Sequence, residues 1–144
     1  MKKSLLGITF TVSVALLIVA CGSKTQPGGK LPTGKTIKAA PIGNLTVTLS
    51  NESGQLKHGD QEFMVTFSDA SGKPVDVGAA SLNFHMVQMG TMAAMNDQAT
   101  LTTTETAGVY SAKVNIEMAG EWQAQIAYEG PAGSGKTTVT VPTQ

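Results

Sequence analysis

Four of the seven methionines of the chain fall in one short stretch, at a strict spacing of three residues: Met86, Met89, Met92 and Met95. Thioether sulfur is soft, polarizable and never protonated at physiological pH, so clustered thioethers suit Cu(I) better than the harder common metals. Methionine also fills irregular gaps in hydrophobic cores. The stretch therefore predicts either a soft-metal site or a set of packing residues.

Further candidate ligands lie beside this stretch and in two other segments. The chain has only two histidines, and one of them directly precedes the first clustered methionine. A Cu(II) site would prefer several imidazoles, so the composition favours Cu(I) as the bound cofactor. The candidate metal ligands are Met86, Met89, Met92, Met95, Met118, His58 and His85.

The elements that must position these residues are β-strands. From residue 45 onward, short alternating segments rich in Val, Thr, Ile, Phe and Tyr are separated by Gly, Asn, Asp and Pro clusters. No segment has a sustained helical period, so we predict an all-β immunoglobulin-like antiparallel sandwich. Its seven expected strands are residues 45–49, 62–67, 80–87, 99–104, 109–117, 121–129 and 137–141.

The strand count predicts where the connecting loops lie. Successive strands of a sandwich run in opposite directions, so alternate connections share one end. The connections at about residues 50–61, 88–98 and 117–120 should therefore share one rim. They carry most of the candidate ligands, and we expect these to converge there: His58, Met89, Met92, Met95 and Met118.

Alternation within the strands separates core positions from exposed ones. Met86 shares a face with Leu82 and Phe84, so the period of two favours a core position for it. Trp122 lies on the sixth expected strand, where we expect a partly buried packing anchor. Tyr110, which opens the fifth strand, is also expected to be structural.

The first 21 residues resemble a bacterial lipoprotein signal peptide. A basic start, an apolar run from Leu5 to Ala20 and then Cys21 imply cleavage before the cysteine, followed by its lipidation with diacylglycerol and an acyl chain such as palmitate. An uncleaved signal anchor is the alternative, although the run is slightly short of the ~20 residues of a spanning helix. We therefore expect a membrane-anchored protein of the cell envelope, facing the periplasm or the cell exterior.

Residues 21–43 are rich in Gly, Pro, Thr and Lys and predict a flexible tether, which leaves residues 44–144 as one domain. That domain has four lysines against all ten acidic residues, a formal charge of −6. The chain contains no arginine, which argues against nucleic acid as a partner. Cys21 is its only cysteine, so an intrachain disulfide is excluded.

Two familiar kinds of site are not expected. Residues 130–137 match the phosphate-loop pattern GxxxxGK[ST], but the residues that follow alternate like a strand and supply no helix N-terminus for phosphates. We therefore expect a Gly-rich loop and no nucleotide. The sequence also brings together no nucleophile with a base and no pair of carboxylates, which indicates a protein that is not an enzyme.

Three motifs in fixed order resemble the YtkA-like domain, which is related to the FixH-like proteins. They are the methionine stretch 86–95, Gly108-Val109-Tyr110, and Met118-Ala119-Gly120-Glu121-Trp122. The resemblance covers about residues 44–142 and implies an immunoglobulin-like sandwich outside the cytoplasm, associated with metal handling or respiratory oxidase assembly. The family's methionine segment contains proline, whereas this chain has Val87-Gln88 and Gly90-Thr91 between its methionines.

Three functional interpretations follow. The leading one is a lipoprotein that binds Cu(I) through the Met-rich loop, for copper buffering or delivery to a membrane partner. The alternative is a non-metal interaction module, whose Met-rich rim docks onto an envelope complex such as a transporter or an oxidase. In the third, the methionines only close the end of the sandwich, buried among Leu82, Phe84 and Trp122.

Overall fold

The computed structural model describes residues 33–144, so the expected signal peptide 1–20, the expected lipidation site Cys21 and the first part of the expected tether lie outside the described residues. Residues 33–144 contain no helix that could span a bilayer. They form nine strands: β1 (Lys35–Ile42), β2 (Leu45–Asn51), β3 (Gly59–Ser68), β4 (Ala79–Met86), β5 (Met95–Gln98), β6 (Thr100–Thr103), β7 (Val109–Ile116), β8 (Gly120–Gly130) and β9 (Gly133–Thr143).

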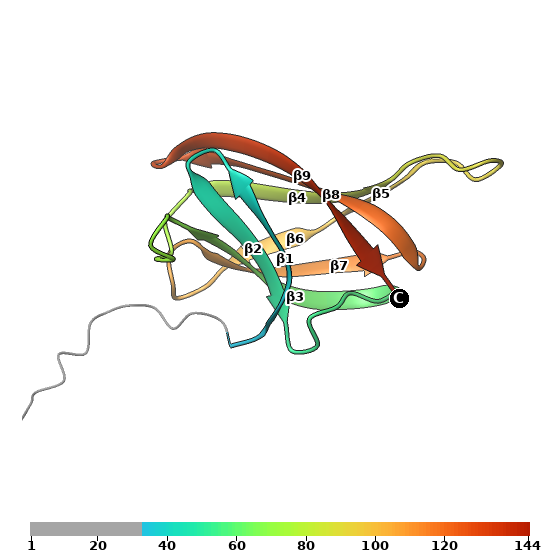
Figure 1. The fold of residues 1–144 in the computed structure, drawn as a ribbon, viewed down its shortest axis with the longest axis horizontal. Coiled ribbons are helices and arrows are strands. Elements are labelled where there is room, and N and C mark those ends of the chain that lie inside the picture. The colour runs from blue at the N-terminus through green and yellow to red at the C-terminus, as the bar shows by residue number, and fades with distance from the viewer. Residues whose placement is uncertain (1–32) are drawn as a thin grey trace, which may run out of the picture.

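The strands make two antiparallel sheets that pack face to face (Figure 1). One sheet has the order β1-β2-β3-β7-β6 and the other has the order β5-β4-β8-β9. The predicted all-β sandwich is confirmed, and an immunoglobulin-like architecture fits two antiparallel sheets of this size.

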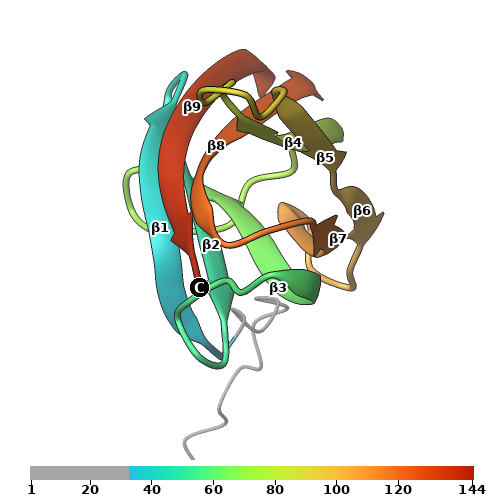
Figure 2. The same ribbon diagram turned by 90° about the vertical axis from the view of Figure 1, so that its right-hand side faces the viewer.

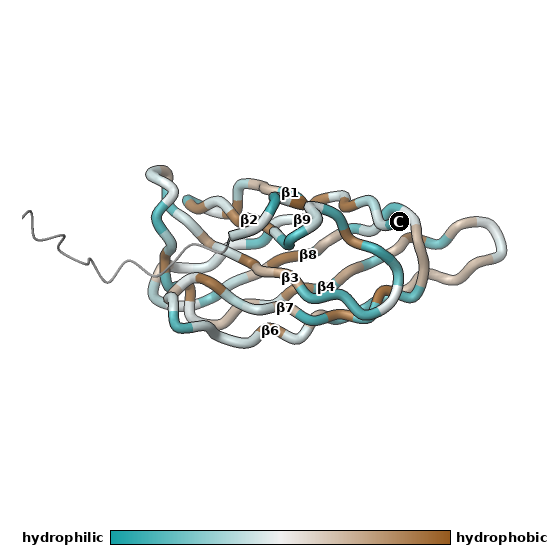
Figure 3. Tube along the Cα trace, turned by 90° about the horizontal axis from the view of Figure 1, so that it is seen from below, coloured by the Kyte–Doolittle hydropathy of each residue, from teal (hydrophilic) through white to brown (hydrophobic). Residues whose placement is uncertain are grey.

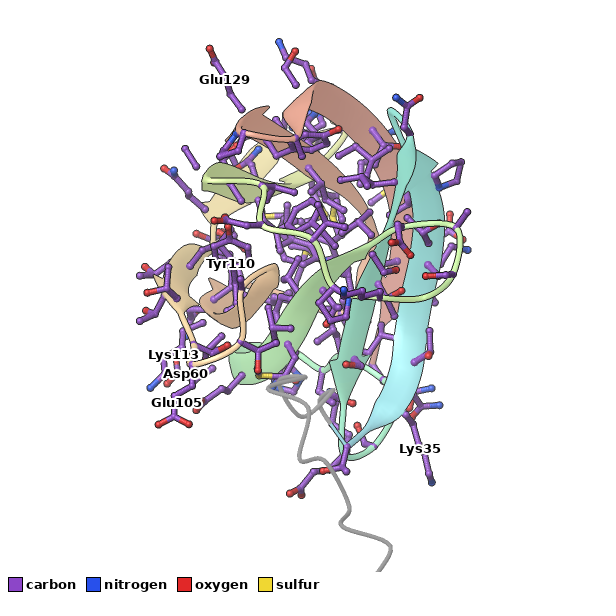
Figure 4. All side chains as sticks on the ribbon, turned by 90° about the vertical axis from the view of Figure 1, so that its left-hand side faces the viewer. Lys35, Asp60, Glu105, Tyr110, Lys113 and Glu129 are labelled. Atoms are coloured by element: carbon purple, nitrogen blue, oxygen red, sulfur yellow. The ribbon has the colours of Figure 1, made fainter. Side chains whose placement is uncertain are left out.

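Alternating apolar side chains from both sheets fill the space between them. On β8, every second residue from Trp122 to Tyr128 is buried, and on β3 the same holds from Phe63 to Phe67. Phe63 packs edge-on against Phe84 of the opposite sheet, with ring centroids 6.0 Å apart. Figure 4 shows the labelled charged side chains pointing away from this interior. Trp122 is completely buried, more deeply than expected.

Tyr110 has the expected structural role. It is buried at the start of β7, and its hydroxyl donates a 2.7 Å hydrogen bond to the carbonyl of Gly78 in the β3–β4 loop. Burial raises the pKa of this hydroxyl, and the negative charge of Asp76 raises it further. The hydroxyl therefore stays protonated and keeps donating to the loop at neutral pH.

The sandwich begins earlier than expected, since residues 35–42 were predicted to belong to the tether but form β1. This strand pairs antiparallel with β2 and buries Ala40 and Ile42. The lysines and Pro41 of this strand interrupt the alternation of apolar and polar residues that would have predicted it. Proline is tolerated there because β1 is an edge strand. The prediction of a tether through residue 43 was therefore wrong for these eight residues.

The second difference is β5, which falls in a predicted loop. Asn96 and Asp97 are poor strand formers, yet residues 95–98 pair with β4 in continuous register. Only Ala99 separates β5 from β6, and its N–H donates to the carbonyl of Leu82 at 2.9 Å while the chain crosses from one sheet to the other. The expected single strand 99–104 is thus the second half of a longer run.

The predicted clustering of three connections at one end is nevertheless confirmed (Figures 1 and 2). The N–H of His58 binds the carbonyl of Gln144, and the Thr143 hydroxyl reaches the carbonyl of Met118. The N–H of Glu117 binds the Asp97 carboxylate at 3.1 Å. The two strands that were not predicted do not change which loops share an end. β1 precedes all the predicted strands, and β5 continues into β6.

Candidate functional site

The four clustered methionines form two cross-strand pairs in the hairpin that joins β4 to β5. Met86 lies opposite Met95, and Met89 lies opposite Met92. The latter two residues exchange backbone hydrogen bonds of 3.2 and 2.9 Å. Two residues separate the pairs on each side, so the register of β4 and β5 continues to the end of the hairpin. We call Met86 and Met95 the inner pair, and Met89 and Met92 the outer pair.

A tight turn made by Gly90 and Thr91 closes the hairpin. Gly90 has a φ of +55°, whereas Thr91 has a negative φ, as in a type II′ turn. Such turns match the twist of antiparallel strands and require glycine at the first central position. Gly90 and Thr91 therefore build this turn and place the outer pair beside it.

The two pairs lie on opposite faces of the hairpin. Side chains alternate along a strand, so residues three apart point in opposite directions. Met86 is 1% exposed and Met95 is half-buried against the core, whereas Met89 and Met92 are 49% and 42% exposed. The prediction that Met95 joins Met89 and Met92 on the rim is therefore wrong, because β5 turns Met95 toward the core.

The inner pair takes part in closing the end of the sandwich. A Cβ atom added to Gly120, which has a φ of +149°, would lie 2.9 Å from the methyl carbon of Met86. The indole N–H of Trp122 donates a 3.0 Å hydrogen bond to the carbonyl of Met118. The Met118 side chain is half-buried against the core. For these methionines the structure agrees with the packing interpretation.

The sequence profile of the YtkA-like family matches residues 39–127, well over half of the chain. The chain belongs to the YtkA-like family. No curated protein and no solved structure matches it. The matched segment includes both methionine pairs, Gly120 and Trp122.

Neither histidine of this YtkA-like domain lies beside the outer pair. His85 faces the same side of the hairpin as Met89 but lies four residues before it, roughly 13 Å along a strand. Its Nδ1 atom contacts Asn96 Oδ1 at 2.9 Å. His58 is exposed beside the C-terminus, and Figure 2 shows the C-terminus on the other side of this end from the hairpin. The expected convergence of histidine and methionine is therefore not observed.

The end of the hairpin, residues 87–94, is exposed throughout, and we call it the hairpin tip. It projects beyond the body of the sandwich (Figure 1). Among residues 33–144, the large hydrophobic side chains that are exposed are Val87, Met89 and Met92, all in the tip. Residues 77–96 contain no Lys, Asp or Glu, and Figure 3 shows the projecting hairpin mostly in white and light brown. The tip is thus a neutral, apolar projection on an acidic domain.

The outer pair offers two soft ligands at this projection. Directly opposed residues have Cβ atoms about 4.5–5.5 Å apart, and methionine has flexible side-chain torsions, so both sulfurs can turn toward one ion between them. Within residues 33–144, no three His, Cys, Asp or Glu side chains are grouped as a metal site. The sequence pointed to Met89 and Met92 among the candidate ligands but not to their pairing, to Val87 or to the turn, although Gly-Thr between two methionines is itself a hairpin signal.

Proposed function

We propose that this protein is a membrane-anchored lipoprotein of the cell envelope whose YtkA-like domain binds Cu(I) through Met89 and Met92. Its role is copper buffering or delivery to a membrane partner, and it is a binding protein, not an enzyme. The single observation that carries the proposal is the exposed cross-strand pairing of these two methionines at the end of a projecting hairpin.

The chemistry of the outer pair supports a copper cargo. Two neutral thioethers favour Cu(I) over Zn²⁺ or Mg²⁺, which prefer nitrogen, thiolate or oxygen ligands. Both sulfur-bearing side chains are accessible to solvent, so an ion held there can be exchanged with another protein. Exchange suits buffering and delivery better than permanent retention. The resemblance of residues 1–21 to a lipoprotein signal supports the envelope location.

The test is a Cu(I) titration of residues 33–144 against a chromophoric chelator that competes for Cu(I). This segment contains both sheets and the buried core, and it omits Cys21, whose sulfur would be a free, copper-binding thiol in protein made without the lipid. We expect binding by the parent and loss of binding in Met89→Leu/Met92→Leu, because leucine keeps the apolar volume and removes the sulfur.

The matched control is Met86→Leu/Met95→Leu, which removes the same number of sulfur atoms from the inner pair. We expect this variant to bind Cu(I) like the parent. Failure of the parent to compete with the chelator would contradict the proposal. Loss of binding in the inner-pair variant alone would contradict the assignment of the site to the outer pair.

A second candidate function is docking onto an envelope complex without metal. The exposure of Val87 beside the outer pair favours it, because an apolar projection suits insertion into a groove of a partner. Copper-dependent growth of cells carrying tip variants separates the two functions. A copper-binding role fails in both Met89→Leu/Met92→Leu and Met89→Ser/Met92→Ser. A docking role survives the leucine changes and fails only with serine.

A further inference from the structure

The outer pair by itself gives a bound Cu(I) ion only two ligands. Two thioethers leave room on a d¹⁰ ion for a third and a fourth soft ligand. The described part of this chain does not supply them at the tip, since Met86 and Met95 face the core and Met118 packs against it. His85 lies roughly 13 Å back along the strand. Further soft ligands therefore come from outside residues 33–144.

We propose that the ligands come from a second copy of this chain, so that one Cu(I) bridges two hairpin tips through Met89 and Met92 of each copy. This inference rests on the proposed function and names the partner of the same site. A two-fold axis through the ion brings two identical pairs together, which is the self-complementary arrangement that closes a dimer. The ion then has four thioether ligands.

The shape and charge of the molecule allow two hairpin tips to come into contact. The tip projects from the body, so two tips touch while the bodies remain apart (Figure 1). Residues 77–96 contain no Lys, Asp or Glu, so the contact desolvates no charged side chain of this segment. Val87, Met89 and Met92, which are exposed in the single chain, become covered. The dimer thus buries the apolar surface that the single chain leaves in water.

The net negative charge of the domain makes the dimer depend on copper. Residues 33–144 carry six lysines against ten acidic residues, a formal charge of −4, so two bodies repel each other at low salt. The hairpin tip is small, and its apolar contact alone is far below the ~1,000 Å² of a stable interface. The metal bridge therefore supplies the attraction, and the copper-free protein is a monomer.

Sedimentation of residues 33–144 with increasing Cu(I) under anaerobic conditions tests the proposal. We expect a monomer without copper and a doubling of mass that is complete at half an equivalent of Cu(I). X-ray absorption at that ratio should show about twice as many sulfur neighbours as one outer pair supplies. Met89→Leu/Met92→Leu should remain monomeric at every copper level, and Met86→Leu/Met95→Leu should dimerise like the parent.

The other outcomes separate this inference from the proposed function. A monomer that binds one full equivalent of Cu(I) through the outer pair overturns the bridged dimer and leaves the copper function standing. Absence of Cu(I) binding overturns both. A dimer that forms without copper and survives the leucine changes overturns the metal bridge, because apolar contact alone then holds the two tips together.

Discussion

The inner and outer methionine pairs belong to one hairpin, share one residue type and are both directly opposed across the same ladder, yet their surroundings are opposite. Met86 is buried against Gly120, whereas Met89 and Met92 are almost half exposed beside a turn. A regular spacing of methionines therefore does not by itself make a four-sulfur site. In a strand, an odd spacing divides the residues between two faces.

The largest expected difference between the pairs is in stability. Met86→Ala should lower the free energy of unfolding by about 2–5 kcal/mol, because it removes a buried side chain and leaves a cavity. Met89→Ala should change it by no more than about 0.5 kcal/mol, since its side chain is largely in water. Urea denaturation of residues 33–144 measures both values.

Met86→Leu is the control for the inner position, and it should cost less than about 1.5 kcal/mol because it nearly conserves volume. Equal losses of stability for the two alanine variants would contradict this difference between the pairs. That outcome would mean that the outer pair packs as firmly as the inner pair.

Two glycines beside the methionine pairs differ in the same way. Gly120 and Gly90 both have a positive φ, but an added Cβ meets the Met86 methyl group at Gly120 and open space at Gly90. Both alanine substitutions should therefore introduce backbone strain, on the order of 1–3 kcal/mol. Gly120→Ala should cost about 1–3 kcal/mol more than Gly90→Ala, because it also overpacks the inner pair.

A double-mutant cycle identifies the source of that extra cost. In a Met86→Ala background the methyl group is absent, so Gly120→Ala should lose its extra penalty and approach the cost of Gly90→Ala. Additive costs in the double variant would show that the penalty at Gly120 comes from the backbone and not from Met86.

The smallest expected effect on stability comes from oxidation of the outer pair. Dilute hydrogen peroxide transfers one oxygen atom to a thioether, which becomes a sulfoxide while the peroxide becomes water. Met89 and Met92 should react well before Met86, and the free energy of unfolding should change by less than about 0.5 kcal/mol. Peptide mass spectrometry after a timed exposure measures the order of reaction.

The same exposure in concentrated urea is the control, because all methionines should then oxidise at similar rates. Oxidation of Met86 in step with Met89 in the folded protein would show that the end of the sandwich opens to solvent. The inner pair would then not be protected from solvent, and the two pairs would not differ in exposure.

Local patterns in the sequence were enough to predict the sandwich and the end at which the loops gather. Alternation on the segments that became β4 and β8 identified inward-facing side chains such as Met86 and Trp122, and turn residues marked the breaks. These signals are local, since a side chain's face within a strand depends only on its position in the alternation. The family motifs pointed to the same fold.

Pairing between distant segments determined which weak segments became strands and how the methionines divide between two faces. β1 and β5 contain Pro41, Asn96 and Asp97, and they are strands because each hydrogen-bonds along a stronger neighbour. Pairing with β4 turned Met95 inward and left Met89 and Met92 together at the tip. Four methionines are close along the chain whatever the fold, but which sulfurs share a face depends on cross-strand register, a relation between residues that no single segment contains.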